Sequence, residues 1–279
     1  MFFTSFCEAC DNVCDIIVII ADESGETDES GRSEDMSASE SATPDTQNTQ
    51  TKASEVVEQY LEAIYNMGME GDTVIGARLA EKFGVAPPTV TETLKRMIRD
   101  GYIAMDSKRQ VTLTPKGVAY AEGVLRRHRL TERFLVDMLG MQWHQVHEEA
   151  CRLEHYISGA VEERVVASLG QPTTCPHGNP IPGSVPDARN YLRDQGAIRL
   201  LHAQPGQPMR LLLVSEVVED EEGIIHYLHD RGIVPGTRLS LVSGPSQPDE
   251  RDAVLALEDG SRLSIPSRVT YALWVVDAA

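Results

Sequence analysis

The chain has 279 residues and a formal net charge of −18 at pH 7, from 43 acidic and 25 basic side chains. This length suggests two or three domains, and a hydrophobic fraction of 41% is ordinary for a soluble globular protein. A uniform charge of this size and sign would oppose binding to a polyanion such as DNA, because like charges repel. No stretch approaches the roughly 20 apolar residues of a membrane helix, and no basic segment precedes the short apolar run 16–21. We therefore expect a cytoplasmic protein with no membrane partner.

The charge is distributed unevenly along the chain. Residues 1–50 hold twelve acidic side chains and one basic one, a net −11, and residues 131–279 carry a net −9. Residues 51–130 carry a net +2, and within them residues 76–116 hold eight basic side chains against four acidic ones. The electrostatic argument against DNA binding therefore fails for this part of the chain.

Residues 1–51 are expected to form a disordered acidic leader, since they are rich in Ser, Thr, Asp and Glu and poor in large apolar side chains. Cys7, Cys10 and Cys14 offer three thiols with no fourth ligand nearby, which is a weak pattern for a zinc or iron–sulfur site. A dispensable segment, or a translation start as late as Met36, is the favoured interpretation. The five cysteines are an odd number, which is a poor disulfide framework.

Residues 52–122 have the pattern of a small DNA-binding domain. Helices are expected from about 54 to 70, 74 to 83 and 88 to 99, followed by a hairpin of strands 102–105 and 111–114. Apolar side chains predicted to face the core include Val56 on the first helix and Ile98 on the third. Three helices followed by a hairpin predict a winged helix-turn-helix.

The third helix and the hairpin tip carry the side chains expected to contact DNA. Short hydroxyls and a carboxylate at the start of the helix suit base edges, and the basic side chains suit phosphates. The candidate residues are Pro88, Thr89, Thr91, Glu92, Lys95, Arg96, Arg99, Lys108 and Arg109.

Potential metal ligands follow on two predicted helices, 119–139 and about 144–158. The second carries His147, Cys151, Glu154 and His155 at positions i, i+4, i+7 and i+8, all on one face, and the first carries His128 and Glu132 one turn apart. Imidazole, thiolate and carboxylate donors together suit iron, manganese, cobalt, nickel or zinc. The spacing is not H-E-x-x-H, so a metalloprotease has little support. His144 stands apart from this pattern and is expected to be an ordinary surface or core histidine.

The C-terminal part is predicted to be a small five-stranded barrel. Its expected strands are 210–214, 238–242, 253–257, 262–265 and 270–275, separated by turns that contain Gly and Pro. The acidic run 219–222 is expected to be a solvated loop.

Several motifs resemble the diphtheria-toxin-type iron-dependent repressors and the related manganese transport regulators. The similar segments are V-E-Q-Y-L-E-A-I-Y (57–65), P-P-T-V-T-E-T-L-K-R-M (87–97), H-R-L-T-E-R-F-L (128–135), H-E-E-A-C-R-L-E-H (147–155) and C-P-H-G-N-P-I-P-G (175–183). The resemblance implies a mainly α chain with small β parts. Its expected units are a winged helix-turn-helix (52–122), a helical metal-binding and dimerisation domain (123–186), a linker (187–208) and an SH3-like, FeoA-like β-barrel domain (209–279).

The resemblance also implies two metal sites. A primary site would use Gln59, Cys151, Glu154 and His155, where Gln59 stands in place of the Met of iron regulators or the Asp of manganese regulators. An ancillary site would use His128, Glu132, His147 and Glu221, and Arg129 and Asn179 match positions that hold an anion. The thiolate at position 151 favours Fe(II) over Mn(II) as the divalent metal.

The expected protein is therefore a homodimeric, metal-dependent repressor that binds a palindromic double-stranded operator of metal-uptake and homeostasis genes, and is not an enzyme. A Mn(II)-responsive repressor is the alternative within the same family. A metalloenzyme would leave the basic third helix and hairpin unexplained. A metal-binding protein without a DNA function is a third possibility.

Overall fold

The computed structural model describes residues 53–218, 220–244 and 252–278. The predictions made for the leader, including its three cysteines and Met36, lie outside the described residues. The boundaries expected between the later domains stay predictions. Among the described helices, none has the length and apolar character needed to cross a bilayer.

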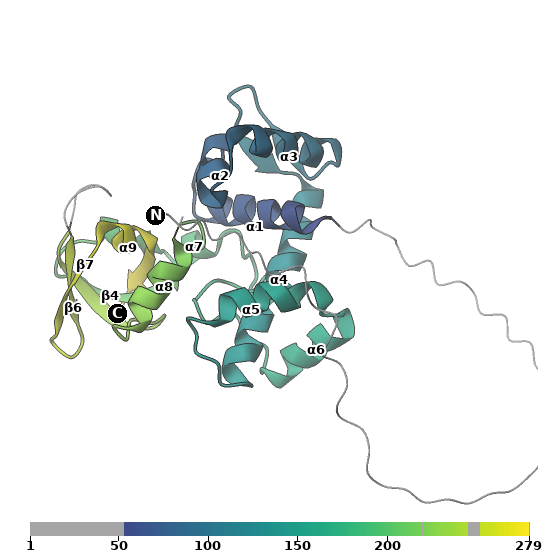
Figure 1. The fold of residues 1–279 in the computed structure, drawn as a ribbon. Helices are drawn as coiled ribbons and strands as arrows, with labels where there is room; N and C mark the ends of the chain where they lie inside the picture. Colours follow the sequence, from purple (N-terminus) through teal and green to yellow (C-terminus); the bar gives the residue numbers. More distant parts are fainter. Residues whose placement is uncertain (1–52, 219, 245–251, 279) are drawn as a thin grey trace, which may run out of the picture. The chain divides into compact units, whose positions relative to one another are not determined.

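The first group of elements is the expected winged helix-turn-helix, drawn in blue and purple in Figure 1. Its elements are α1 (Glu55–Met69), α2 (Gly76–Phe83), α3 (Pro87–Arg99) and the antiparallel pair β1 (Ile103–Met105) and β2 (Val111–Leu113). Gly84 ends α2 in the left-handed region at φ 61°, which glycine adopts without steric cost. Pro87 and Pro88 then fill the first turn of α3, where no backbone donor is missed.

The core of this group contains most of the apolar side chains that helical spacing predicts, including the fully buried Leu61, Leu79 and Met97. Two predicted core residues are wrong, because Val56 is 48% exposed and Ile98 is 42% exposed. Both lie at the edge of the apolar stripe of their helix. Successive residues of a helix are rotated by 100° about its axis, so a residue next to a buried one can face solvent.

A helical group follows, formed by α4 (Pro115–Asp137), α5 (Val146–Leu153), the 3₁₀ turn η1 (Glu154–Tyr156) and α6 (Gly159–Ser168). The Thr114 hydroxyl accepts a hydrogen bond from the Gly117 backbone N–H and begins α4 four residues before the predicted start. The helix predicted over 144–158 is shorter, because the chain tightens to a 3₁₀ turn at Glu154. This change of pitch alters the directions of Glu154 and His155 relative to Cys151.

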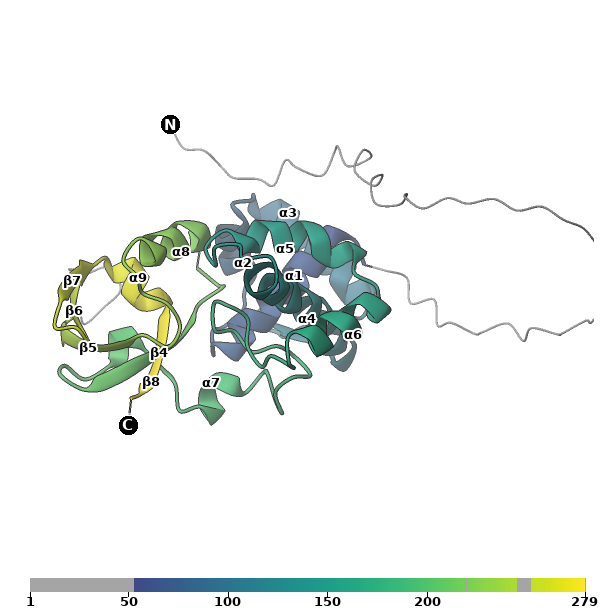
Figure 2. The same cartoon turned by 90° about the horizontal axis from the view of Figure 1, so that it is seen from below.

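The C-terminal group forms one antiparallel sheet, whose described strands have the order β3-β8-β4-β5-β6-β7. In chain order the elements are α7 (Tyr191–Asp194), β3 (Ile198–Arg199), η2 (Leu200–His202), β4 (Pro208–Val214), α8 (Glu221–His229), β5 (Arg238–Ser243), β6 (Ala253–Leu257), β7 (Arg262–Ile265), α9 (Ser267–Ala272) and β8 (Leu273–Asp277). Register shifts in β4 and β5 bend the sheet, and α8 and α9 lie against it (Figure 2). Both helices contribute apolar side chains to its core.

Two predictions for this group are wrong. The sequence interpreted as a solvated acidic loop opens α8, because the Asp220 carboxylate caps the helix by accepting from the Gly223 N–H. The strand expected from Thr270 begins at Leu273, because residues 267–272 form α9.

Gly117 provides a test of how the hairpin packs on α4. A Cβ atom at this position would lie 2.0 Å from the Tyr102 carbonyl oxygen, which belongs to the backbone and cannot move independently. We expect Gly117→Ala to lower the free energy of unfolding by about 1–3 kcal/mol, measured by urea denaturation. In Gly123→Ala of the same helix the new Cβ meets only the flexible Arg127 side chain at 3.8 Å, so stability should stay equal or rise. Equal losses in both variants would contradict this packing.

Candidate metal centre

The Glu132 carboxylate of α4 lies at the middle of the predicted ligand cluster and is fully buried. His128 Nε2 lies 3.2 Å and His147 Nδ1 3.5 Å from Glu132 Oε1, and His177 Nδ1 lies 3.2 Å from the same carboxylate. Burial opposes ionisation of this group, but the facing rings of His177 and His128 hold the pKa of Glu132 well below its usual range. One carboxylate therefore links three imidazoles that come from separate segments.

Cys151 on α5 joins two of these histidines. Its Sγ lies 3.8 Å from His147 Nε2 and 4.0 Å from His128 Nδ1, and the donor atoms of the three residues lie within 4.8 Å of one another. Burial opposes ionisation of the thiol, yet the neighbouring His147 and His128 lower the pKa of Cys151 to about 7. A thiol with this pKa is readily present as the thiolate that binds metals.

The 3₁₀ turn η1 brings Glu154 and His155 to the same cluster. Glu154 Oε2 lies 2.7 Å from His128 Nδ1, and Glu154 Oε1 lies 3.5 Å from His155 Nε2. The other ring nitrogen of His155 lies 3.0 Å from Glu58 Oε2 on α1. His128 thus contacts donors that the sequence assigned to two separate sites, and η1 connects the cluster to α1.

Gln59, the ligand expected from α1, lies on the exposed side of this helix. Its side chain is exposed, whereas Glu58 is buried and Glu62, one turn further along α1, is half-buried. Glu62 Oε1 is itself buried and makes no hydrogen bond to any described residue. Burial, followed by the proximity of Glu154, raises the pKa of Glu62 well above its usual range. A helix that buries position 58 turns position 59 away by 100° and returns to the same side at position 62.

Cys175 and His177 are two potential donors that the sequence interpretation did not assign as metal ligands. Glu132, Cys175 and His177 form a second group whose donor atoms lie within 4.8 Å of one another, and all three are buried. His177 is oriented by its Nε2, which lies 2.9 Å from the Trp143 carbonyl oxygen. The C-P-H-G segment contains the signal, since a cysteine and a histidine two residues apart in a tight turn can face one ion.

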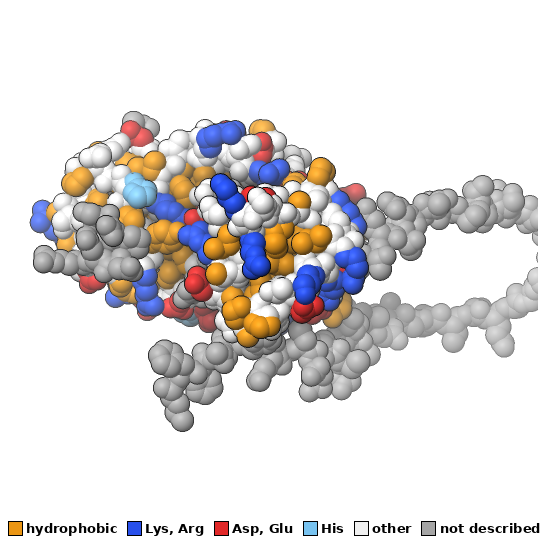
Figure 3. Space-filling view, turned by 90° about the horizontal axis from the view of Figure 1, so that it is seen from above, with side chains coloured by type: hydrophobic (Ala, Val, Ile, Leu, Met, Phe, Trp, Pro, Cys, Tyr) orange, Lys and Arg blue, Asp and Glu red, His pale blue; other side chains and the backbone are white. Residues whose placement is uncertain are grey.

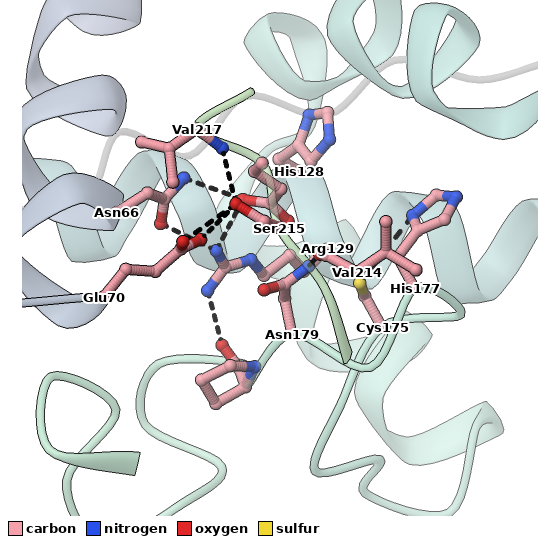
Figure 4. Close-up of polar contacts among 12 residues, drawn as sticks. Asn66, Glu70, His128, Arg129, Cys175, His177, Asn179, Val214, Ser215 and Val217 are labelled. Carbon is pink, nitrogen blue, oxygen red and sulfur yellow. Dashed lines mark hydrogen bonds and ion pairs between the residues drawn. The ribbon is translucent and has the colours of Figure 1, made fainter. Parts of the chain in front are cut away.

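Arg129 and Asn179, the expected anion-binding pair, are engaged inside the protein. The fully buried Arg129 guanidinium donates to Glu216 Oε2 at 2.7 Å, to Asn66 Oδ1 at 2.9 Å and to the Pro180 carbonyl at 2.7 Å (Figure 4). Asn179 donates its amide N–H to the Val214 carbonyl at 3.0 Å. The Arg129 guanidinium thus meets the chain's own Glu216 carboxylate where a free anion was expected.

Glu221 reaches the cluster from the C-terminal group. Its Oε1 lies 3.9 Å from His147 Nδ1, and its Oε2 lies 3.4 Å from Lys82 Nζ on α2. Lys82 also donates to the carbonyls of Glu216 and Val218. The stretch of residues 215–218 and 220, called here the β4–α8 segment, therefore connects the metal cluster to the helix-turn-helix.

The candidate DNA-binding residues lie on one side of the first group. Figure 3 looks onto this side, where Lys and Arg side chains are spread among apolar and neutral ones. Side chains of the predicted set are exposed, except that of Arg96, which is half-buried and donates to Ser54 Oγ at 3.1 Å. Lys95 pairs with Glu92 at 2.7 Å on the open face of α3, and both side chains are exposed.

Comparison with known proteins agrees with this arrangement. The model of the iron-dependent repressor N-terminal DNA-binding domain matches residues 52–111, and that of the metal-binding and dimerisation domain matches residues 114–183. The iron-dependent repressor IdeR of Mycobacterium leprae (strain TN) is 37% identical over 228 residues, which cover 79% of this chain and 96% of that protein. The chain belongs to the iron-dependent repressor family.

Further similar proteins include a second curated repressor and a solved structure of a manganese-dependent repressor. The diphtheria toxin repressor of Corynebacterium efficiens is 34% identical over 224 residues, covering 79% of this chain and 95% of that protein. The solved structure of a manganese-dependent transcriptional repressor in complex with manganese has a TM-score of 0.65 and 30% identity, and covers 79% of this chain and 99% of that one. The iron-dependent repressor family thus accounts for all three groups of elements.

The residues of this family member fit a divalent metal. The cluster supplies imidazole nitrogens, one low-pKa thiol and several carboxylates, which is a donor set for iron or manganese. The buried Glu62 Oε1, which lacks a hydrogen-bond donor among the described residues, is a carboxylate oxygen that a cation would satisfy.

Glu70 at the end of α1 joins this helix to the C-terminal group through contacts whose contribution to stability depends on pH. Its buried carboxylate accepts from Arg199 at 2.8 Å, from the Ser215 hydroxyl at 2.7 Å and from the Trp274 indole at 3.2 Å. Burial raises the pKa of Glu70 to about 7, against 4.5 for the free group. The folded protein therefore binds this proton more tightly than the unfolded chain does, and the contribution to stability is lost as the pH rises through 7.

We expect the stability difference between wild type and Glu70→Gln to fall as the pH rises from about 5.5 to about 8, because only the wild type has this titration. Urea denaturation in this range stays above the isoelectric point of about 4.8. The exposed α6 variant Glu163→Gln serves as the control and should give a constant difference. A constant difference for Glu70→Gln as well would mean that Glu70 is already ionised throughout.

Proposed function

We propose that this protein is a metal-dependent, DNA-binding transcriptional repressor of metal-uptake and homeostasis genes. The observation that carries the proposal is the convergence of donors from α1, α4, α5 and α8 directly behind a winged helix-turn-helix. The names of its relatives support it, since they are iron-dependent or manganese-dependent repressors and not enzymes. A repressor acts where the genome lies, so we place it in the cytoplasm.

For the primary site we propose Cys151, Glu154 and His155 together with Glu62, in place of the expected Gln59. Glu62 has a buried oxygen that accepts no hydrogen bond from the described residues, and burial, together with the charge of Glu154, raises its pKa. Gln59, by contrast, is exposed. Glu58 supports the site from α1 by orienting His155, and the Tyr120 hydroxyl donates to Glu58 at 2.7 Å. Such supporting hydrogen bonds fix the direction of a ligating ring.

For the ancillary site we propose His128, Glu132, His147 and Glu221, with Cys175 and His177 as further donors around Glu132. The support is the shared Glu132 carboxylate and the buried group that it forms with Cys175 and His177. We propose that the Glu216 carboxylate, held by Arg129, takes the part expected of a free anion.

We favour Fe(II) as the metal and keep Mn(II) as the alternative. The thiol of Cys151, with its pKa of about 7, suits Fe(II), Co(II) or Zn(II) better than Mn(II). Glu62 adds a carboxylate oxygen, which suits Mn(II) as well as Fe(II). When bound, a divalent cation would neutralise part of the carboxylate charge and join donors of α1 to those of α4 and α5.

The packing of α1 explains how metal binding would affect the DNA-binding helix α3. Helix α1 carries Glu58 and Glu62 on one side and packs its apolar side into the core that also holds α2, α3 and the hairpin. The position of α1 therefore sets the position of α3. If the donors can bind an ion together only when α1 is in one position, metal binding favours that position. Such a difference in affinity is the condition for a ligand to shift a conformational population.

A second copy of the chain is the partner that the family assignment indicates, since the matched model includes a dimerisation domain. The helical group exposes apolar side chains that suit such an interface: Met138, Leu139, Leu153, Tyr156 and Val161. We propose that this surface pairs with its copy about a twofold axis, and that two α3 helices then contact a palindromic double-stranded operator.

Operator binding tests the proposed function. A duplex selected by the protein from a random library should be bound far more tightly with Mn(II) or anaerobic Fe(II) than in chelator, measured by fluorescence anisotropy. Lys108→Glu at the hairpin tip should weaken binding roughly tenfold through loss of a phosphate contact. Arg193→Glu, the same charge change at an exposed residue of α7, is the matched control and should bind as wild type does. Equal affinity in metal and chelator would contradict the proposal.

The choice between Glu62 and Gln59 is tested by metal affinity in the absence of DNA. Glu62→Gln should weaken Mn(II) binding at the primary site by roughly ten- to a hundredfold, since it removes a charged donor. Gln59→Ala removes a side chain of similar size three residues earlier on the same helix and should leave the affinity unchanged. Competition titration against a fluorescent chelator measures both, and the reverse order would restore Gln59 as the ligand.

A further inference from the structure

Three histidines gather away from the proposed metal centre. His144 lies between α4 and α5, and His226 and His229 lie on α8. The ring centroid of His144 is 3.7 Å from that of His229 and 4.6 Å from that of His226. Positions i and i+3 of a helix share one side, so α8 offers both of its rings to the same neighbour.

This cluster differs from an ordinary group of surface histidines in its surroundings. His144 Nδ1 is buried and makes no hydrogen bond to any described residue. Glu222 Oε1, one turn before His226 on α8, lies 3.9 Å from His226 Nε2 and places a carboxylate beside the rings. Burial, and then the nearby His229 and His226, lower the pKa of His144, so its ring is neutral with a lone pair available at pH 7.

We propose that His144, His226 and His229 form a separate binding site for a borderline transition-metal ion such as Zn(II) or Ni(II), with Glu222 as the fourth protein donor. Three imidazoles and one carboxylate are a usual donor set for these ions. The rings of His226 and His229 lie close to that of His144, with centroid distances of 4.6 and 3.7 Å, but the nitrogens of the three rings are not gathered within 4.8 Å of one another as the donor atoms of the proposed metal centre are. An ion would draw them to about 3.4 Å, the separation of nitrogens bound to one tetrahedral Zn(II). The tilted stack of His144 on His229 has to open by rotation about χ2 for both rings to face the ion.

Such an ion would join the α4–α5 connection to α8. Both attachment points lie close in sequence to residues of the proposed metal centre, since α8 begins with Glu221 and His147 follows His144 by three residues. Binding at the histidine cluster would therefore hold Glu221 against His147. The histidine cluster, which has no thiolate, would prefer a different metal ion from the one bound at the centre that contains Cys151.

Zinc stoichiometry of the full-length chain, freed of any affinity tag, tests the proposal. Wild type and the double variant His226→Gln/His229→Gln are dialysed against buffered Zn(II), and bound metal is counted by mass spectrometry. We expect the double variant to lose one equivalent per chain. His202→Gln, which changes an exposed histidine of η2, is the matched control and should retain it.

A second variant separates this loss from damage to the centre around Glu132. His144→Asn changes another element and should remove the same single equivalent, and combining it with the double variant should remove no more. Unchanged stoichiometry in either variant, or additive losses on combining them, would overturn the proposal. The measurement does not depend on DNA binding or on the Fe(II) or Mn(II) response.

Discussion

Buried negative charge around Glu132 is the constraint on which the rest of the structure depends. Glu58, Glu132 and Glu154 are almost completely removed from water within one small region, and isolated buried carboxylates are very unfavourable. The chain compensates them with imidazoles, and Glu132 and Cys151 raise the pKa of His128 well above its usual range despite its burial. A divalent cation would provide the same compensation without protons, and metal binding at such a site is expected to release protons.

The same constraint explains why elements far apart in sequence meet here. Each carboxylate needs a partner from another element: Glu58 contacts η1, Glu154 contacts α4, and Glu221 contacts both α5 and α2. The Arg129–Glu216 pair adds a buried connection between α4 and the β4–α8 segment. Removing one member of such a pair leaves an uncompensated buried charge, which is costly. The contacts that prepare the metal centre are therefore also the contacts that hold the three groups of elements together.

The sequence predicted the helix-turn-helix and most of the ligand cluster because both follow local periodicity. His147 and Cys151, or His128 and Glu132, are one helical turn apart whatever their tertiary surroundings are. Periodicity does not fix the direction of Glu154, which depends on a 3₁₀ turn, and Gln59 was expected only from the family resemblance, while its exposure depends on how α1 is rotated against the rest of the chain. Glu216 and His177 were missed for a related reason, since loop residues acquire their roles only from long-range packing. The histidine cluster likewise joins residues 82 positions apart, so His144 had no sequence signal of its own.

At the hairpin tip, one residue fixes the conformation of the turn and others carry its positive charge. Asp106 Oδ1 accepts from the backbone N–H groups of Lys108 and Gln110, each at 2.8 Å, and this fixes the turn. Arg109 occupies the left-handed region at φ 61°, where a residue with a Cβ is less stable than glycine by about 1 kcal/mol. The Arg109 side chain is exposed, and the hydrogen bonds that fix the turn come from Asp106 and backbone N–H groups. The hairpin therefore combines a fixed turn with an exposed positive charge at its end. In the proposed repressor, this charge would be able to adjust to a phosphate backbone whose position varies from one DNA sequence to another.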